Sequence, residues 1–122
     1  MTAADAIGPV YSAADAMSAL GVTKAVLDDR VRNHEVLAIE TVDGVVVFPA
    51  WQFDERGQVL PGVAETLQAL ATGGMDDFTH VLWFNGPSED LDGKSASEWL
   101  TEGHDPEVVV QQARRAAHRW LQ

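Results

Sequence analysis

The stretch that decides the fold reads Phe78-Thr-His-Val-Leu-Trp-Phe-Asn-Gly-Pro-Ser-Glu-Asp-Leu-Asp-Gly-Lys-Ser-Ala-Ser-Glu-Trp99. Phe78, Val81 and Leu82 recur three and four residues apart, which indicates one face of a helix rather than an alternating strand. Asn85-Gly86-Pro87 predicts the end of that helix, because Asn and Gly tolerate a cap and proline cannot continue a helix. The stretch therefore predicts two short helices joined by a tight polar turn.

The ends of these two helices are marked by polar residues. Asp76 and Asp77 precede the first helix and are typical N-caps. Ser95 followed by Glu98 is a capping box, which predicts the start of the second helix. Because Leu100 is its neighbour on this helix, Trp99 is predicted to be mostly buried, with Glu98 and the turn 88–92 exposed.

The same stretch carries a pattern: a helix closing with Trp and one more apolar residue, a Pro, a Leu-x-Gly turn, and a capped helix with Glu-Trp-Leu. The residues are Trp83, Pro87, Leu91, Gly93, Ser95, Glu98, Trp99 and Leu100. The pattern resembles the toxin-binding domain of the Xre/MbcA/ParS antitoxins, over roughly the second half of the chain. The resemblance implies binding of a RES-type toxin, an NAD-consuming enzyme whose active site the C-terminal segment would block. The same residue types also describe the core of any small helical domain, so that alternative stays open.

Composition and charge exclude several classes of protein. The chain has 122 residues, 46% of them hydrophobic and 22% charged, which is typical of one soluble globular domain or of two small subdomains sharing a core. No apolar run reaches membrane-spanning length and no signal-peptide pattern opens the chain, so a cytoplasmic location is expected. Zero cysteines exclude disulfides and thiolate metal sites.

The net charge is −11, and both halves of the chain are acidic. An acidic surface counts against a protein whose only task is to bind nucleic acid, and it suits a basic partner as well as simple solubility.

The first half predicts a helix-turn-helix with a wing. Ala16-Met-Ser-Ala-Leu-Gly-Val-Thr23 reads as a helix, a glycine turn and a Thr-capped helix, and it looks most like the truncated type of MerR and excisionase proteins. Asp43-Gly44 between the β-branched runs 36–42 and 45–48 predicts a two-stranded hairpin in the place of the wing. Residues 1–10, with a Gly-Pro breaker, are predicted to be a flexible lead-in.

The second helix of this motif is a weak DNA-binding candidate. The residues that could reach phosphates or bases are Thr23, Lys24, Arg30 and Arg32. Asp28 and Asp29 lie between them and would repel phosphate. The motif therefore indicates either weak DNA binding or a helix-turn-helix kept as a fold or dimer scaffold.

The second half predicts the partner-binding surface. Pro61 fits the first turn of a helix that Gly73-Gly74 ends, and Asp105-Pro106 starts a long last helix with a buried stripe of Val109, Ala113, Ala116 and Trp120. The arginines of that helix either complement its dipole or contact an acidic or phosphate-bearing site on a partner. With the family-like residues, the candidate partner-binding set is Trp83, Asn85, Pro87, Leu91, Gly93, Glu98, Arg114, Arg115 and Arg119.

No motif for catalysis or metal binding is found. The four histidines lack metal-ligand spacing, and the chain has no phosphate-binding loop, nucleophile elbow or dinucleotide fingerprint. We therefore expect a protein that is not an enzyme and that takes no cofactor and no metal.

Together these patterns predict a mostly helical α+β protein. A winged helix-turn-helix over residues 11–57 is followed by a small helical bundle over residues 58–122. The expected function is that of an antitoxin whose partner is a RES-type toxin, with operator DNA and a homodimer as further expectations and no membrane. The alternative is a stand-alone winged helix-turn-helix transcription regulator whose acidic second half dimerises or binds a partner; an adaptor for another protein is a third.

Overall fold

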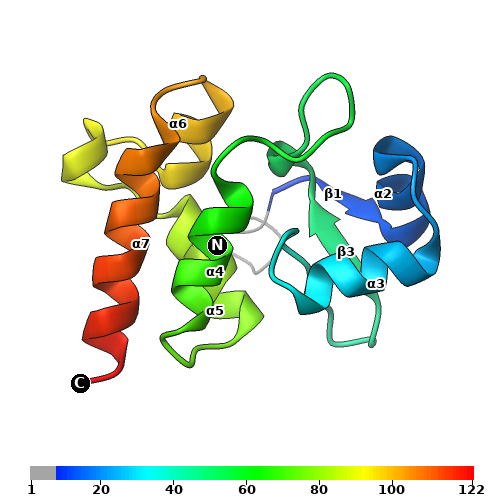
Figure 1. Cartoon of the computed structure of the whole chain (residues 1–122), viewed down its shortest axis with the longest axis horizontal. Helices are drawn as coiled ribbons and strands as arrows, with labels where there is room; N and C mark the ends of the chain where they lie inside the picture. The colour runs from blue at the N-terminus through cyan, green and yellow to red at the C-terminus, as the bar shows by residue number, and fades with distance from the viewer. Residues whose placement is uncertain (1–7) are drawn as a thin grey trace.

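The computed structural model describes residues 8–122, and in this part the chain is α+β and mostly helical (Figure 1). The first half contains β1 (Val10–Ser12), α2 (Ala13–Leu20), α3 (Lys24–Arg32), β2 (Ile39–Glu40), β3 (Val46–Pro49) and the 3-10 helix η1 (Ala50–Gln52). The second half contains α4 (Val63–Ala71), α5 (Asp77–Asn85), the 3-10 helix η2 (Glu89–Leu91), α6 (Ala96–Thr101) and α7 (Pro106–Trp120). The predicted fold class, a helix-turn-helix with a hairpin followed by a helical bundle, is confirmed.

Local capping chemistry builds the helix-turn-helix. The Ser12 hydroxyl accepts the Asp15 N–H at 3.1 Å and starts α2. Gly21 then ends α2 in the left-handed conformation, with φ of 68°. Two residues later the Thr23 hydroxyl accepts the Val26 N–H at 3.3 Å and starts α3. The predicted caps Ser12 and Thr23 and the predicted stop at Gly21 are therefore all present, and Gly21 and Thr23 define the turn between the two helices.

The wing belongs to a small antiparallel sheet with strand order β1-β3-β2. The predicted hairpin is present, with Ile39 opposite Val47, but its first strand is short. Strand β1 was not predicted: Val10 pairs with Pro49 and therefore lies in the sheet rather than in a flexible lead-in. The remainder of the predicted lead-in, residues 1–7, lies outside the described residues.

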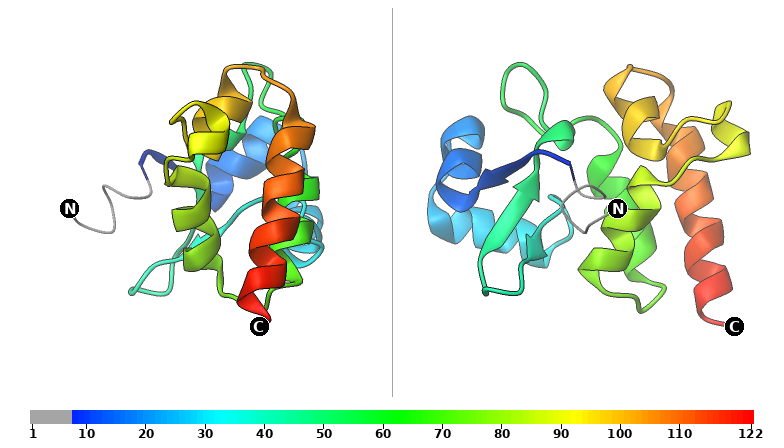
Figure 2. Two further views of the ribbon diagram at one scale, coloured as in Figure 1. Left: turned by 90° about the vertical axis from the view of Figure 1, so that its left-hand side faces the viewer. Right: turned by 180° about the vertical axis from the view of Figure 1, so that it is seen from behind.

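The second half is organised around α4 and α7, which lie side by side and run in the same direction (Figures 1 and 2). Gly62, just before α4, lies against Pro106 at the start of α7, and Gly73, just after α4, lies against Trp120 near its end. Helix α4 begins at Val63, later than predicted, because Gly62 takes a left-handed φ of 92°. None of the helices in residues 8–122 combines the length and apolar character needed to cross a bilayer.

The predicted buried stripe of α7 is largely confirmed. Val109, Ala113 and Ala116 are fully buried, while Trp120 is half-buried at the end of the helix. The small side chains at 113 and 116 allow α4 to approach closely.

Two clusters of buried apolar side chains form the core, and they do not follow the two halves of the sequence. Leu37 and Ile39, which come from the first half, pack with α4, α5 and α7. Val36 and Ala38, the residues beside them, pack with the helix-turn-helix instead. The predicted domain boundary between residues 57 and 58 stays a prediction. Residues 36–39 join the two clusters, because their side chains point alternately into one and the other.

Gln52 joins the same segment to η1 through its side chain. Its Oε1 accepts the Leu37 N–H and its Nε2 donates to the Leu37 carbonyl, both at 2.8 Å. The Nε2 also donates to the Pro49 carbonyl at 3.1 Å. Because Gln52 is fully buried, this amide takes the place of a neighbouring strand for Leu37.

His80 on α5 is a buried histidine, and neither ring nitrogen has a hydrogen-bond partner within residues 8–122. Its ring stacks on Trp120 with the centroids 6.3 Å apart. Burial lowers the pKa of His80, and His34 adds to this, whereas Asp77 and Asp76 at the start of α5 oppose it. The folded protein therefore binds a proton at this ring more weakly than the unfolded chain does.

We expect the free energy of unfolding to fall as the pH is lowered through the ordinary histidine pKa of 6.5. Above that pH both states hold His80 neutral, and below it only the unfolded chain is protonated until the lower folded-state pKa is reached. Urea unfolding at about pH 7.5 and about pH 5.5 measures the loss, which His80→Phe should reduce. His118→Gln, at an exposed position, is the control. An equal pH dependence in His80→Phe would contradict the assignment.

Candidate partner-binding groove

The junction between α5 and α6 is a compact hydrogen-bonded turn. Pro87 and Ser95 form an antiparallel bridge, and the Ser88 N–H donates to the Lys94 carbonyl at 3.0 Å. The predicted capping box is present: the Ser95 hydroxyl accepts the Glu98 N–H at 3.1 Å, and the Glu98 carboxylate accepts the Ser95 N–H at 3.0 Å. The backbone hydrogen bond from Ser95 holds the pKa of Glu98 below its ordinary value.

Side chains connect the two helices directly as well. The Ser97 hydroxyl donates to Asn85 Oδ1 at 3.1 Å and lies 3.0 Å from the Ser95 hydroxyl. This places the end of α5 against the start of α6. The turn between them, including the exposed Asp90, is therefore held in one position relative to both helices.

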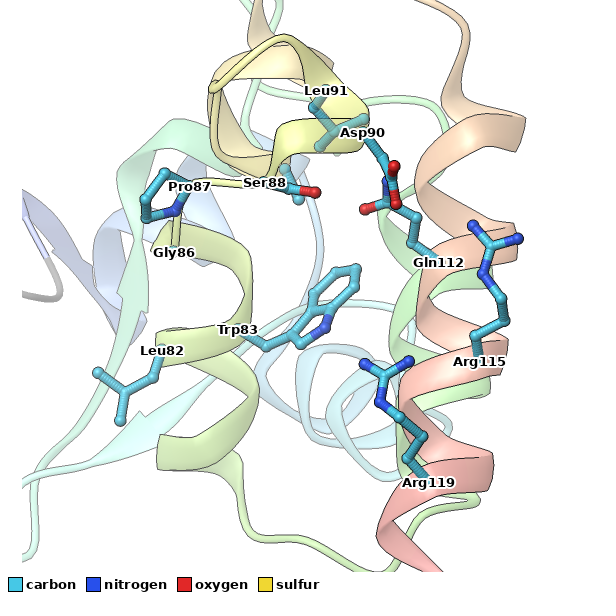
Figure 3. A pocket seen from close by; sticks show the side chains of 11 residues that line it. Leu82, Trp83, Gly86, Pro87, Ser88, Asp90, Leu91, Gln112, Arg115 and Arg119 are labelled. Atoms are coloured by element: carbon cyan, nitrogen blue, oxygen red, sulfur yellow. The ribbon is translucent and has the colours of Figure 1, made fainter.

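A groove of about 310 Å³ opens between α5, the turn at η2 and α7 (Figure 3). Its walls carry both apolar and charged side chains. The lining residues are Leu82, Trp83, Gly86, Pro87, Ser88, Asp90, Leu91, Ala96, Gln112, Arg115 and Arg119.

Helix α7 contributes one polar face to this groove. Gln112, Arg115 and Arg119 follow one another along it, at spacings that place them on one side of a helix (Figure 3). In residues 8–122 no carboxylate lies within ion-pair distance of Arg115 or Arg119, whereas Arg114, on the next face, lies 3.7 Å from Glu107. The Gln112 Nε2 is buried and has no hydrogen-bond partner among the described residues.

The groove brings together five of the nine residues predicted to bind a partner. They are Trp83, Pro87, Leu91, Arg115 and Arg119. Leu91 is fully buried, so it supports the floor of the groove and is not part of an exposed turn as predicted. Gln112, Ser88 and Asp90 were not predicted; the position of Gln112, three residues before Arg115, is the signal that could have found it.

The other four predicted residues lie outside the groove. Asn85 holds the α5–α6 junction, and Glu98 caps α6 while remaining exposed. Gly93 is exposed in the turn with φ of 80°, and Arg114 lies on the adjacent face of α7. Their predicted role in partner binding therefore has no support from this groove.

Trp99 is half-buried and packs against the larger core cluster. Its indole N–H donates to the Asp105 carbonyl at 2.8 Å, and its ring lies 4.5 Å from that of His104. Since Asp105 caps α7, Trp99 joins α6 to the start of α7. This agrees with the prediction that it is a structural residue, although it is less buried than expected.

The candidate DNA-binding surface on α3 has few free charges. Lys24 forms an ion pair with Asp28 at 2.9 Å, and Arg32 forms one with Asp29. The Thr23 hydroxyl caps the helix, and half-buried Arg30 borders a shallow hollow together with Glu35. The wing adds the exposed acidic side chains of Glu40, in β2, and Asp43, in the loop at its tip.

No group of three or more potential metal ligands gathers within residues 8–122. The buried His80 therefore belongs to no such group of ligands in this part of the chain.

The geometry defines a winged helix-turn-helix joined to a helical bundle with one mixed groove. A solved structure with the same fold is the NMR structure of Rv2175c, which superimposes with a TM-score of 0.65 over 93% of this chain and 79% of that one. The two sequences are 22% identical, so the likeness shows the fold alone. No family model matches the chain, and no curated protein matches it either.

Proposed function

We propose that this protein is a regulator of the antitoxin kind, in which the groove between α5 and α7 binds a protein partner, with a RES-type toxin as the expected one. The observation that carries the proposal is the gathering of Trp83, Pro87, Arg115 and Arg119 in one groove. These residues come from segments about thirty positions apart, and aromatic and arginine side chains are the types most enriched where binding energy concentrates.

The packing of α7 also bears on which part of this protein would contact such a partner. Helix α7 packs along α4 and forms a wall of the groove, so the proposed contact is made by the helix face rather than by an extended segment. The partner-binding half shares its core with Leu37 and Ile39, and the proposal is therefore tested on the full chain.

Replacing Trp83 with Ala is expected to weaken the complex with a RES-type toxin by about 2–3 kcal/mol, as loss of a central aromatic anchor does. Co-expression should show that the full chain protects cells from the toxin and that the Trp83→Ala chain protects poorly. Circular dichroism establishes that the variant is folded. Leu121→Ala, an exposed apolar residue outside the groove, is the matched control. Full protection by a folded Trp83→Ala chain would contradict the role of the groove.

A stand-alone DNA-binding regulator is the second candidate, and the exposed helix-turn-helix favours it. Helix α3 carries Lys24, Arg30 and Arg32, and its N-terminal turn is exposed. The ion pairs to Asp28 and Asp29 reduce the charge available to phosphates, so we propose DNA binding that is weak without a partner.

The salt dependence of DNA binding measures this. Two or three phosphate contacts predict a log–log slope of only about −2 to −3, since each contributes roughly −0.9. Replacing both Asp28 and Asp29 with Asn should release Lys24 and Arg32 and steepen the slope by about one to two units. Asp90→Asn, in the groove, is the control in a fluorescence-anisotropy titration. Tight DNA binding by the unmodified chain at physiological salt would favour the stand-alone regulator over the antitoxin proposal.

A further inference from the structure

The α7 wall of the groove presents hydrogen-bond donors without acceptors. Gln112 Nε2 is buried and unpartnered, and the guanidinium groups of Arg115 and Arg119 have no carboxylate within ion-pair distance in residues 8–122. Although the chain has a net charge of −11, basic side chains gather on α7, where Arg114 and His118 lie beside the two arginines. Three donors on one wall call for an acceptor with more than one oxygen.

We propose that the groove binds a carboxylate, presented by an aspartate or glutamate side chain in an extended segment of the protein partner. The inference rests on the proposed partner-binding role of the groove and names the chemistry it selects. A carboxylate offers two oxygens, which suits the planar forks of Arg115 and Arg119, and a further lone pair for the Gln112 amide. In the free protein the buried Gln112 amide lacks an acceptor, which is unfavourable, and a bound carboxylate would provide that acceptor.

The net charge of the groove favours a single negative charge over a phosphate group. Arg115 and Arg119 bring two positive charges, and Asp90, exposed on the turn at η2, brings one negative charge (Figure 3). One carboxylate therefore balances the charge of these three side chains, whereas a phosphate group, with close to two negative charges, leaves an excess of negative charge. In a chain with a net charge of −11, such an excess is unfavourable.

The remaining lining fits the peptide on either side of that acidic residue. Trp83, Leu82 and Pro87 offer apolar surface to neighbouring side chains. The Asp90 carboxylate lines the groove, is exposed and forms no ion pair in residues 8–122, so it is available to accept a backbone N–H of a bound segment. The expected motif is therefore an acidic residue next to an apolar one.

Selection from a phage-displayed library of random peptides on the full, immobilised chain tests the proposal. The enriched peptides should share an acidic residue beside an apolar one, and they should be lost from a chain carrying Arg115→Gln and Arg119→Gln. Arg114→Gln, which removes one positive charge at the neighbouring position outside the groove, should retain them. In a synthetic peptide, exchanging the selected Glu for Gln should weaken binding about tenfold or more.

A double-mutant cycle decides where the carboxylate lies. The exchange of Glu for Gln should matter less than about twofold on the double arginine variant, and an undiminished effect there would overturn the proposal. Binding at least about tenfold tighter by a phosphoserine peptide would assign the groove to phosphate instead and overturn it equally.

The outcome also separates this inference from the proposed function. If the selected peptides lack acidic residues but no longer bind the Trp83→Ala chain, the carboxylate inference is wrong, while the groove remains the binding site. If the peptides bind the wild-type and Trp83→Ala chains equally well, the groove is not the binding site. Failure to select any peptide overturns the carboxylate inference, while protection against the toxin still judges the proposed function independently.

Discussion

Replacing Gln52 with Met is expected to lower the free energy of unfolding by about 3–5 kcal/mol. Met preserves much of the volume but cannot hydrogen-bond the Leu37 N–H and carbonyl or the Pro49 carbonyl. Because Gln52 is fully buried, water does not replace these bonds, and each orphaned backbone group costs roughly 1–3 kcal/mol. Chemical denaturation followed by circular dichroism measures the change.

Gln58 provides the matched control for this substitution. Its side chain is exposed, and its backbone forms two hydrogen bonds with Asp54: the Gln58 N–H donates to the Asp54 carboxylate, and the Gln58 carbonyl accepts the Asp54 N–H. Gln58→Met should therefore change stability by less than about 0.5 kcal/mol. Similar midpoints for the two variants would show that the amide of Gln52 contributes no more than an exposed one.

Replacing Gly62 with Ala is expected to cost about 3–5 kcal/mol, through two separate effects. The left-handed φ of 92° is strained for any residue with a Cβ. That Cβ would also lie 2.4 Å from the Cβ of Pro106, so α4 and α7 would have to separate where their N-termini meet. Thermal unfolding of the variant, followed by circular dichroism, measures the cost.

Gly74 separates the two effects, since it has a φ of 76° and nothing within 4 Å of an added Cβ. Gly74→Ala should cost only about 1 kcal/mol, the backbone contribution alone. The difference between the two variants then measures the close approach of α4 to α7. Equal losses of stability in the two variants would show that α4 and α7 can separate at Gly62 without a cost in free energy.

The sequence predicts four of the helix starts well because each of these four is encoded within a few residues. Ser12, Thr23, Asp76 and Ser95 all accept a backbone N–H in the first turn that follows them. Such short-range hydrogen bonds need no knowledge of the rest of the fold.

The long-range features escaped prediction for the opposite reason. Strand β1 forms because Val10 pairs with Pro49 of β3. No local sequence pattern predicts a pairing partner that far along the chain. The run from Val36 to Val42 was predicted as a full strand, yet β2 covers only Ile39–Glu40. The side chain of Gln52 takes the hydrogen bonds of Leu37 that a longer strand would have used.

The candidate site divides in the same way. The family-like pattern named Trp83 and Pro87, which line the groove. The arginines were predicted from their place on the last helix alone, which does not distinguish Arg115 from Arg114. That distinction depends on how α7 is rotated against α4, which buried Ala113 and Ala116 fix. Residues that face the groove were therefore predicted together with residues that face away from it.

The shared core has a consequence for the lifetime of the protein in a cell. Leu37 and Ile39 follow the helix-turn-helix directly, yet they pack with the helices that form the groove. A partner that binds the groove therefore stabilises the winged half as well, by about 2.7 kcal/mol when its concentration is about a hundred times its dissociation constant. Since proteases degrade chains largely through their opened states, the bound form should outlast the free form about a hundredfold, and free protein would be the fraction that is turned over.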